Sequence, residues 1–110
     1  MRHPAEPEDL DGAVQCLHPD PAKSAPMLDR RLYDLTRAAI LDAVPTNGSG
    51  LLTASLRTEV ARRVPAQAYA TVSVGWCTTL VRLDLQARGL LLRVPTEGMP
   101  RLLRRPRPRR

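Results

Sequence analysis

Four polar residues between positions 78 and 86 have the types and the spacing to contact the edges of nucleic-acid bases. They are Thr78, Thr79, Arg82 and Gln86. Arginine and glutamine form bidentate hydrogen bonds with guanine and adenine, and threonine reaches a phosphate or a thymine methyl group. A helical wheel places the four on one face of a helix, opposite a broad apolar arc. The same pattern also fits a helix face that is only solvated.

A second group of basic residues follows this helix and is suited to phosphate contacts. Its members are Arg93, Arg101, Arg104, Arg105 and Arg107. The last 13 residues, 98–110, contain six arginines and no acid, which equals the net charge of +6 of the whole chain. Residues 1–30, by contrast, carry six acidic and three basic side chains. The alternative interpretation of the basic end is a solubilising tail.

Asp84 falls within the apolar arc of the same helix, where an unpaired carboxylate would be costly. We therefore expect it to pair with Arg88, with an arginine of another helix or with backbone amides. It has no second titratable group near it in the sequence, so we interpret it as structural rather than catalytic. His3, Cys16 and His18 lack the paired spacing of metal ligands. The sequence thus predicts no enzyme, no metal and no cofactor.

The elements that would position these residues follow from caps and periodicity. Asp29 and Pro45 delimit a helix over 30–44, and Thr53 is a candidate cap for a second helix that ends at Pro65. Ser73 and Gly89 delimit a third over 74–88, in which we expect Trp76 to be largely buried. Strands over 90–94 and 99–104 form a hairpin, with which the pair Leu51–Leu52 could associate.

This order predicts an α+β, mostly helical fold: a winged helix-turn-helix of three helices and a C-terminal β-hairpin. The predicted divisions are an acidic extended arm over 1–26, the winged helix domain over 27–104 and an arginine/proline tail over 105–110. We expect the first dozen residues to be poorly fixed and dispensable for folding. Cys16 and Cys77 are expected to be free thiols, because the chain has no export signal.

The third predicted helix also resembles the signature of a small, uncharacterised bacterial family of winged helix type. The pattern is Gly-Trp-aromatic followed by Val-x-Leu-Asp-Leu-x-Ala-basic-Gly. It is matched at Gly75, Trp76, Val81, Leu83, Asp84, Leu85, Ala87, Arg88 and Gly89. The resemblance extends over residues 14–105, through the segment 50–53 and Pro100. Cys77 and Leu103 depart from it, each standing where the family places an aromatic residue. More loosely, residues 84–91 are similar to the end of the recognition helix in winged helix transcription regulators.

Two functions are compatible with this sequence. The first is binding of double-stranded DNA by a transcriptional regulator or other nucleic-acid-associated factor, with the third helix in the major groove. The second is a protein–protein interaction module that uses the same scaffold without DNA. Leu91, which we expect on the outer face of the hairpin, suggests a homodimer contact. No membrane segment is recognisable, so we expect a cytoplasmic location.

Overall fold

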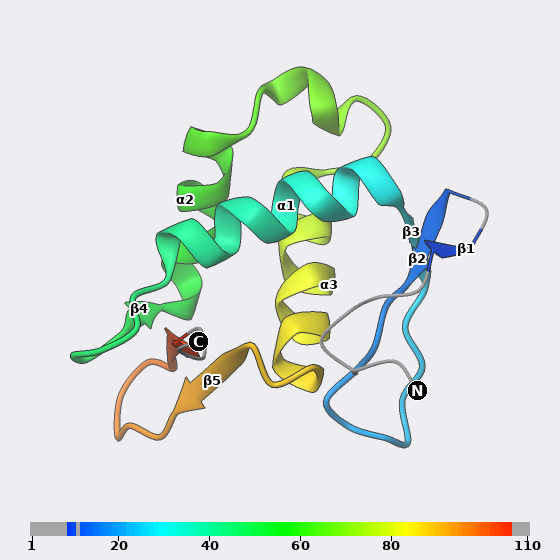
Figure 1. Ribbon diagram of the computed structural model, residues 1–110. Coiled ribbons are helices and arrows are strands. Elements are labelled where there is room, and N and C mark those ends of the chain that lie inside the picture. Colours follow the sequence, from blue (N-terminus) through cyan, green and yellow to red (C-terminus); the bar gives the residue numbers. More distant parts are fainter. Residues whose placement is uncertain (1–8, 11, 107–110) are drawn as a thin grey trace.

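The computed structural model describes residues 9–10 and 12–106 and shows a small α+β fold (Figure 1). Three α-helices, two short 3₁₀ turns and two three-stranded antiparallel sheets follow one another in it. The helices are α1 (Arg30–Ala43), α2 (Leu56–Arg63) and α3 (Val74–Ala87), and the turns are η1 (Thr53–Ser55) and η2 (Ala66–Tyr69). The strands are β1 (Asp9–Leu10), β2 (Ala13–Gln15), β3 (Met27–Asp29), β4 (Leu51–Leu52), β5 (Leu91–Val94) and β6 (Arg101–Arg104).

Local capping chemistry sets the ends of α1 and α3, as the sequence predicts. The Asp29 carboxylate accepts from the backbone N–H of Leu32 at 3.2 Å, and the Ser73 hydroxyl accepts from that of Trp76 at 3.0 Å. Gly89 follows α3 with φ of 79°, a left-handed conformation that glycine adopts without steric cost. The second helix differs from the prediction. Thr53 begins η1 and forms no capping bond, so α2 starts only at Leu56.

The C-terminal sheet joins β4 to the hairpin in the order β4–β6–β5. Leu51 lies opposite Leu102, and Leu91 lies opposite Arg104. The predicted association of Leu51–Leu52 with the hairpin is therefore confirmed. Gly50 makes this contact possible: its φ is 83°, and a Cβ atom there would come within 2.5 Å of the Leu102 carbonyl oxygen.

The N-terminal segment is more ordered than the extended arm expected from its composition. Strands β1, β2 and β3 form a second sheet, and the Gly12 carbonyl accepts from the N–H of Arg30 at 2.9 Å. Val14 and Cys16 are 0% and 2% exposed and belong to the core. The expectation that the first dozen residues are poorly fixed and dispensable stays a prediction, and residues 1–8 and 11 lie outside the described residues.

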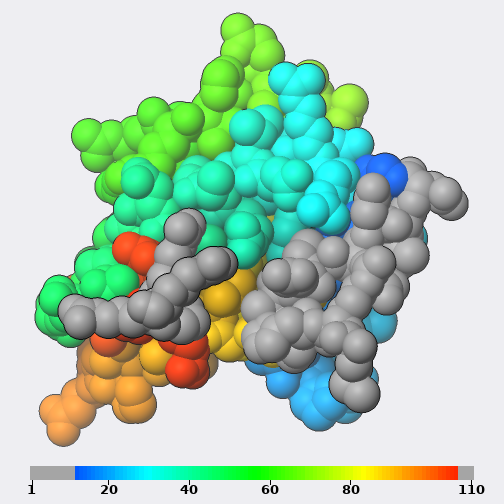
Figure 2. All heavy atoms as spheres, viewed as in Figure 1, coloured from blue at the N-terminus to red at the C-terminus, as the bar shows by residue number. Residues whose placement is uncertain are grey.

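The core lies where α1 crosses α2 and α3, and Figure 1 shows the two sheets on different sides of these helices. In the same view Figure 2 shows α1 in front of α3. The largest fully buried side chains come from α1, α2, α3 and both sheets. They include Tyr33, Ile40, Leu56, Leu85, Leu91 and Leu102. Leu91 therefore faces the core, and the expected outward dimer contact at this residue is wrong; Leu92 is the exposed neighbour.

Candidate nucleic-acid interface

Five residues of α3 point away from the core and define what we call the outer face of α3. They are Trp76, Thr79, Arg82, Leu83 and Gln86, of which Trp76 and Thr79 are exposed and the other three half-buried. Three of the four predicted base-contacting residues are thus on one face. The fourth, Thr78, is not, because it is only 4% exposed.

The burial of Thr78 and the exposure of Trp76 have one cause. The buried arc of α3 contains the polar residues Thr78 and Asp84 together with its apolar members, and the buried Arg88 follows at the end of the helix. An arc predicted from the apolar residues alone lies closer to Trp76, which in the structure is 45% exposed. The prediction that Trp76 is largely buried is therefore wrong. The sequence signal that could have corrected the prediction for Trp76 is the position of Asp84, which the helical wheel already placed inside the arc.

Arg82 and Arg93 are neighbouring cations on this side of the molecule. The guanidinium of Arg82 donates to Oε1 of Gln86 at 2.6 Å, which holds both side chains along α3. Burial lowers the pKa of Arg82, and the positive charge of Arg93 lowers it further. Within the described part of the chain, neither arginine forms an ion pair with a carboxylate.

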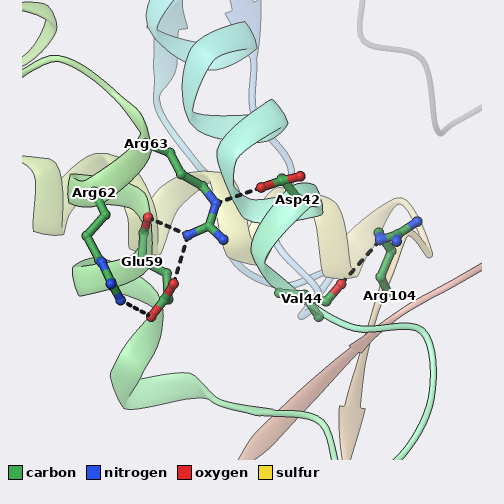
Figure 3. Close-up of polar contacts among 6 residues, drawn as sticks. All are labelled: Asp42, Val44, Glu59, Arg62, Arg63 and Arg104. Carbon is green, nitrogen blue, oxygen red and sulfur yellow. Dashed lines mark hydrogen bonds and ion pairs between the residues drawn. The ribbon is translucent and has the colours of Figure 1, made fainter.

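The other predicted hairpin arginines donate to backbone carbonyl groups of two connecting segments, between α1 and β4 and between α3 and β5. Arg101 donates to Gly50 O at 3.2 Å, Arg104 to Val44 O at 3.2 Å, and Arg105 to Gly89 O at 2.7 Å. Figure 3 shows the Arg104 contact at the end of α1. These residues therefore have a structural role, while the N–H groups that are not engaged remain available to a ligand. Arg107 lies outside the described residues.

Arginines on α2 are neutralised by acids instead. Arg63 donates to Asp42 at 2.7 Å and to Glu59 at 2.8 Å, and Arg62 donates to Glu59 at 3.3 Å (Figure 3). The bonds to Arg63 and the positive charges of both arginines lower the pKa of Glu59. This exposed network joins α2 to α1. It leaves Arg57, which lies against Gly75 at the start of α3, as the cation of α2 that has no ion pair among the described residues.

Asp84 is the centre of a buried polar cluster, as expected from its place in the arc. It is 0% exposed and bonds to three separate parts of the chain. Nε of Arg88 donates to it at 2.9 Å, the N–H of Leu17 at 2.8 Å, and the Tyr33 hydroxyl donates as well. Burial and the bond to Asp84 raise the pKa of Tyr33. The prediction of a cationic or amide partner for Asp84 is confirmed, and the carboxylate is fully engaged in holding the fold.

The two cysteines are free, as expected, and the structure shows both to be buried, so they should react slowly in the native protein. Burial raises the pKa of the Cys16 thiol from 9.0 to about 12, with a further contribution from the charge of Asp84. Because the thiolate is the reactive form, we expect Ellman's reagent at pH 8 to label the folded protein about a hundredfold or more slowly than the urea-unfolded chain. A Cys16→Ala variant assigns the residual rate to Cys77. Rapid labelling of one thiol without denaturant would contradict this prediction.

The raised pKa of Cys16 also makes the free energy of unfolding depend on pH. The unfolded thiol ionises near pH 9, whereas the folded one keeps its proton until about pH 12. Its contribution to the free energy of unfolding is therefore complete below pH 9 and is lost as the pH rises from 9 toward 12.

Within residues 9–10 and 12–106, no group of three or more His, Cys, Asp or Glu side chains is arranged to hold a metal ion. No described helix is long and apolar enough to cross a membrane.

The fold and this surface define a small α+β domain with a partly basic face beside its third helix. The chain belongs to a family of unknown function, DUF6958, whose sequence pattern matches residues 13–102. No curated protein and no solved structure gives a significant match to the chain. The family match agrees with the expected membership of a small uncharacterised family.

Proposed function

We propose that the protein is a winged helix domain that binds double-stranded DNA. The observation that carries this proposal is the arrangement of α3 beside a hairpin whose second strand pairs with β4. The elements α1, β4, α2, α3, β5 and β6 follow one another along the chain, and their sheet has the order β4–β6–β5. This succession supports the proposal because it is the one we expect of a winged helix domain. In such domains the third helix enters the major groove and the hairpin lies on the adjacent backbone.

The charges of the second half of the chain support this proposal. Residues 61–110 contain eleven basic and two acidic side chains, and Asp84, one of those two acids, is fully buried. On the surface, Thr79, Arg82 and Gln86 of α3 lie where they would face bases, and Arg93 lies where it would face the backbone. This set is narrower than the sequence predicts, because Thr78 is buried.

The proposal predicts a steep salt dependence to which the tail contributes. We expect a fluorescently labelled random duplex to bind at low salt, with a negative slope of log affinity against log salt. Deleting residues 106–110 removes three arginines and keeps Arg104 and Arg105 on their carbonyl partners. The slope should flatten by up to about 3, since each neutralised phosphate contributes about 0.9.

An Arg62→Gln variant is the control for charge alone, because Arg62 is paired with Glu59 on α2. It should leave the slope nearly unchanged. Absence of duplex binding by the full chain at low salt would reject the proposed function.

One observation favours a protein partner instead. Leu92 and Met99 are 41% and 62% exposed, and Trp76 is exposed on α3. Leu92 lies opposite Leu103, so apolar side chains occupy the outward side of the hairpin. Such a surface suits a protein contact or a second copy of the chain. A chain that forms a concentration-dependent dimer or complex and binds no duplex would support this second function.

A further inference from the structure

A groove of about 370 Å³ lies along the second half of α3. Four parts of the chain form it. Arg82, Leu83 and Gln86 line it from α3, and residues 18–20 line it from the N-terminal segment. The remaining lining comes from the C-terminal sheet and from η1, through Thr53, Arg93, Pro100 and Leu102.

Two cations line this groove. Arg82 and Arg93 come from a helix and a strand, and neither forms an ion pair with a described acid. Like charges at close range in a partly desolvated site repel one another. An anion placed between the two guanidinium groups would remove that repulsion and accept charge-assisted hydrogen bonds from both.

The groove also offers polar atoms that have not been used elsewhere. The Thr53 hydroxyl oxygen is buried and has no hydrogen-bond partner among residues 9–10 and 12–106. Nδ1 of His18 accepts from the N–H of Asp20 at 2.9 Å, so a neutral His18 carries its proton on Nε2 and can donate from it. A buried hydroxyl without a partner is costly, and a ligand oxygen would satisfy it.

Asp20 is the acid among the residues that line the groove, and it is already engaged. Its Oδ1 accepts from the N–H of Ala22 at 3.0 Å, within a turn of the N-terminal segment. With Arg82 and Arg93, the formal charge of the lining remains positive.

We propose that this groove binds a phosphate group, held by Arg82 and Arg93 with the Thr53 hydroxyl as a further donor. A tetrahedral phosphate presents several oxygens in different directions, which suits donors arriving from a helix, a strand and a turn. A planar carboxylate matches the fork of a single guanidinium better. The phosphate belongs either to a small molecule or to a nucleic-acid backbone. In the second case the inference rests on the proposed function and assigns Arg82 to the backbone instead of a base edge. In the first case it is independent of the proposed function.

The test is a pair of titrations followed by backbone ¹⁵N–¹H NMR at low ionic strength. One uses inorganic phosphate and the other a short random DNA duplex. We expect saturable shifts confined to the N–H signals of residues 18, 20, 53, 82–86 and 93. Arg93→Gln should weaken the response about tenfold or more, the effect of losing one charge-assisted hydrogen bond. The Arg93 side chain is exposed and forms no ion pair with a described acid, so this change should leave stability intact.

Two further variants separate a built site from general attraction of anions. Thr53→Val removes the unpartnered hydroxyl and should weaken the same response. Arg31→Gln removes an equal charge from an exposed site in a different hollow, between α1 and η2, and should not. Equal effects of Arg93→Gln and Arg31→Gln would overturn the proposal.

The two titrations also separate the site from the proposed function. Saturation by inorganic phosphate without duplex binding would support the site with a small-molecule source and reject DNA binding. Groove shifts with duplex alone would assign the phosphate to a nucleic-acid backbone. Duplex binding that bypasses the groove, with no response to phosphate, would overturn this inference and leave the proposed function standing.

Discussion

Replacing Asp84 with alanine should destabilise the fold by about 3–5 kcal/mol, the usual result of removing one partner of a buried ion pair. Asp84 accepts from Arg88, Tyr33 and the backbone of Leu17, and its side chain is fully buried. The variant would remove all three bonds and take the carboxylate away from a guanidinium that is itself 5% exposed. Small domains are stable by only about 5–15 kcal/mol, so a large fraction of the stability should be lost. Urea denaturation followed by circular dichroism measures it.

Asp34→Ala is the matched control for this variant. Asp34 also pairs with an arginine one helical turn away, Arg30 at 3.3 Å, but the pair is exposed. We expect a loss of about 0.5 kcal/mol or less there. A loss at Asp84 as small as that at Asp34 would show that the buried cluster contributes little to stability.

Replacing Val14 with aspartate should cost about 3–5 kcal/mol as well, although the residue lies in a segment that its composition assigns to an arm. The Val14 side chain is 0% exposed in the core, so the variant would bury a carboxylate and remove apolar packing. Thermal unfolding with a structural probe on α3 would measure the loss.

The control for Val14 is Met27→Asp in the same sheet. Met27 lies on β3, which pairs with β2, and is 46% exposed. We expect a change of at most about 1 kcal/mol, because a charge there stays in water. Equal and small effects of the two substitutions would mean that the N-terminal sheet can separate from the helices without disturbing them.

The sequence predicts α1 and α3 closely because their signals are local. Asp29 and Ser73 cap their helices through the next few residues, and Gly89 ends α3 by its own conformational freedom. The hairpin of β5 and β6 also follows from a short-range turn signal, whereas β4 pairs with β6 across about 50 residues, and only the apolar pair Leu51–Leu52 indicates a strand there. The strands β1, β2 and β3 carry a weaker signal: they have two or three residues each, and a segment with three prolines separates β2 from β3.

The surface residues were less predictable because tertiary contacts decide them. The orientation of α3 depends on Asp84, whose partner Leu17 is 67 residues away. The position of the Arg104 side chain also depends on a distant residue, because its acceptor, the Val44 carbonyl, is 60 residues away. Amphipathic periodicity cannot distinguish an arginine that reaches a distant carbonyl from one that points into water. Arg82 and Gln86 were predictable as a pair because four residues along a helix bring side chains together.

The bonds from Arg101, Arg104 and Arg105 to backbone carbonyls also bear on the entropy of any later association. A long cationic side chain that is free in solution loses about 0.5–1.5 kcal/mol of rotamer freedom when a ligand immobilises it. These three have already lost much of that freedom on folding, and a guanidinium keeps further N–H groups when one is engaged. A lysine could not bond to a backbone carbonyl and also offer a ligand a second donor at a fixed position, because all its N–H donors belong to one nitrogen on a flexible side chain. The hairpin thus presents its positive charges as a preorganised array at fixed positions.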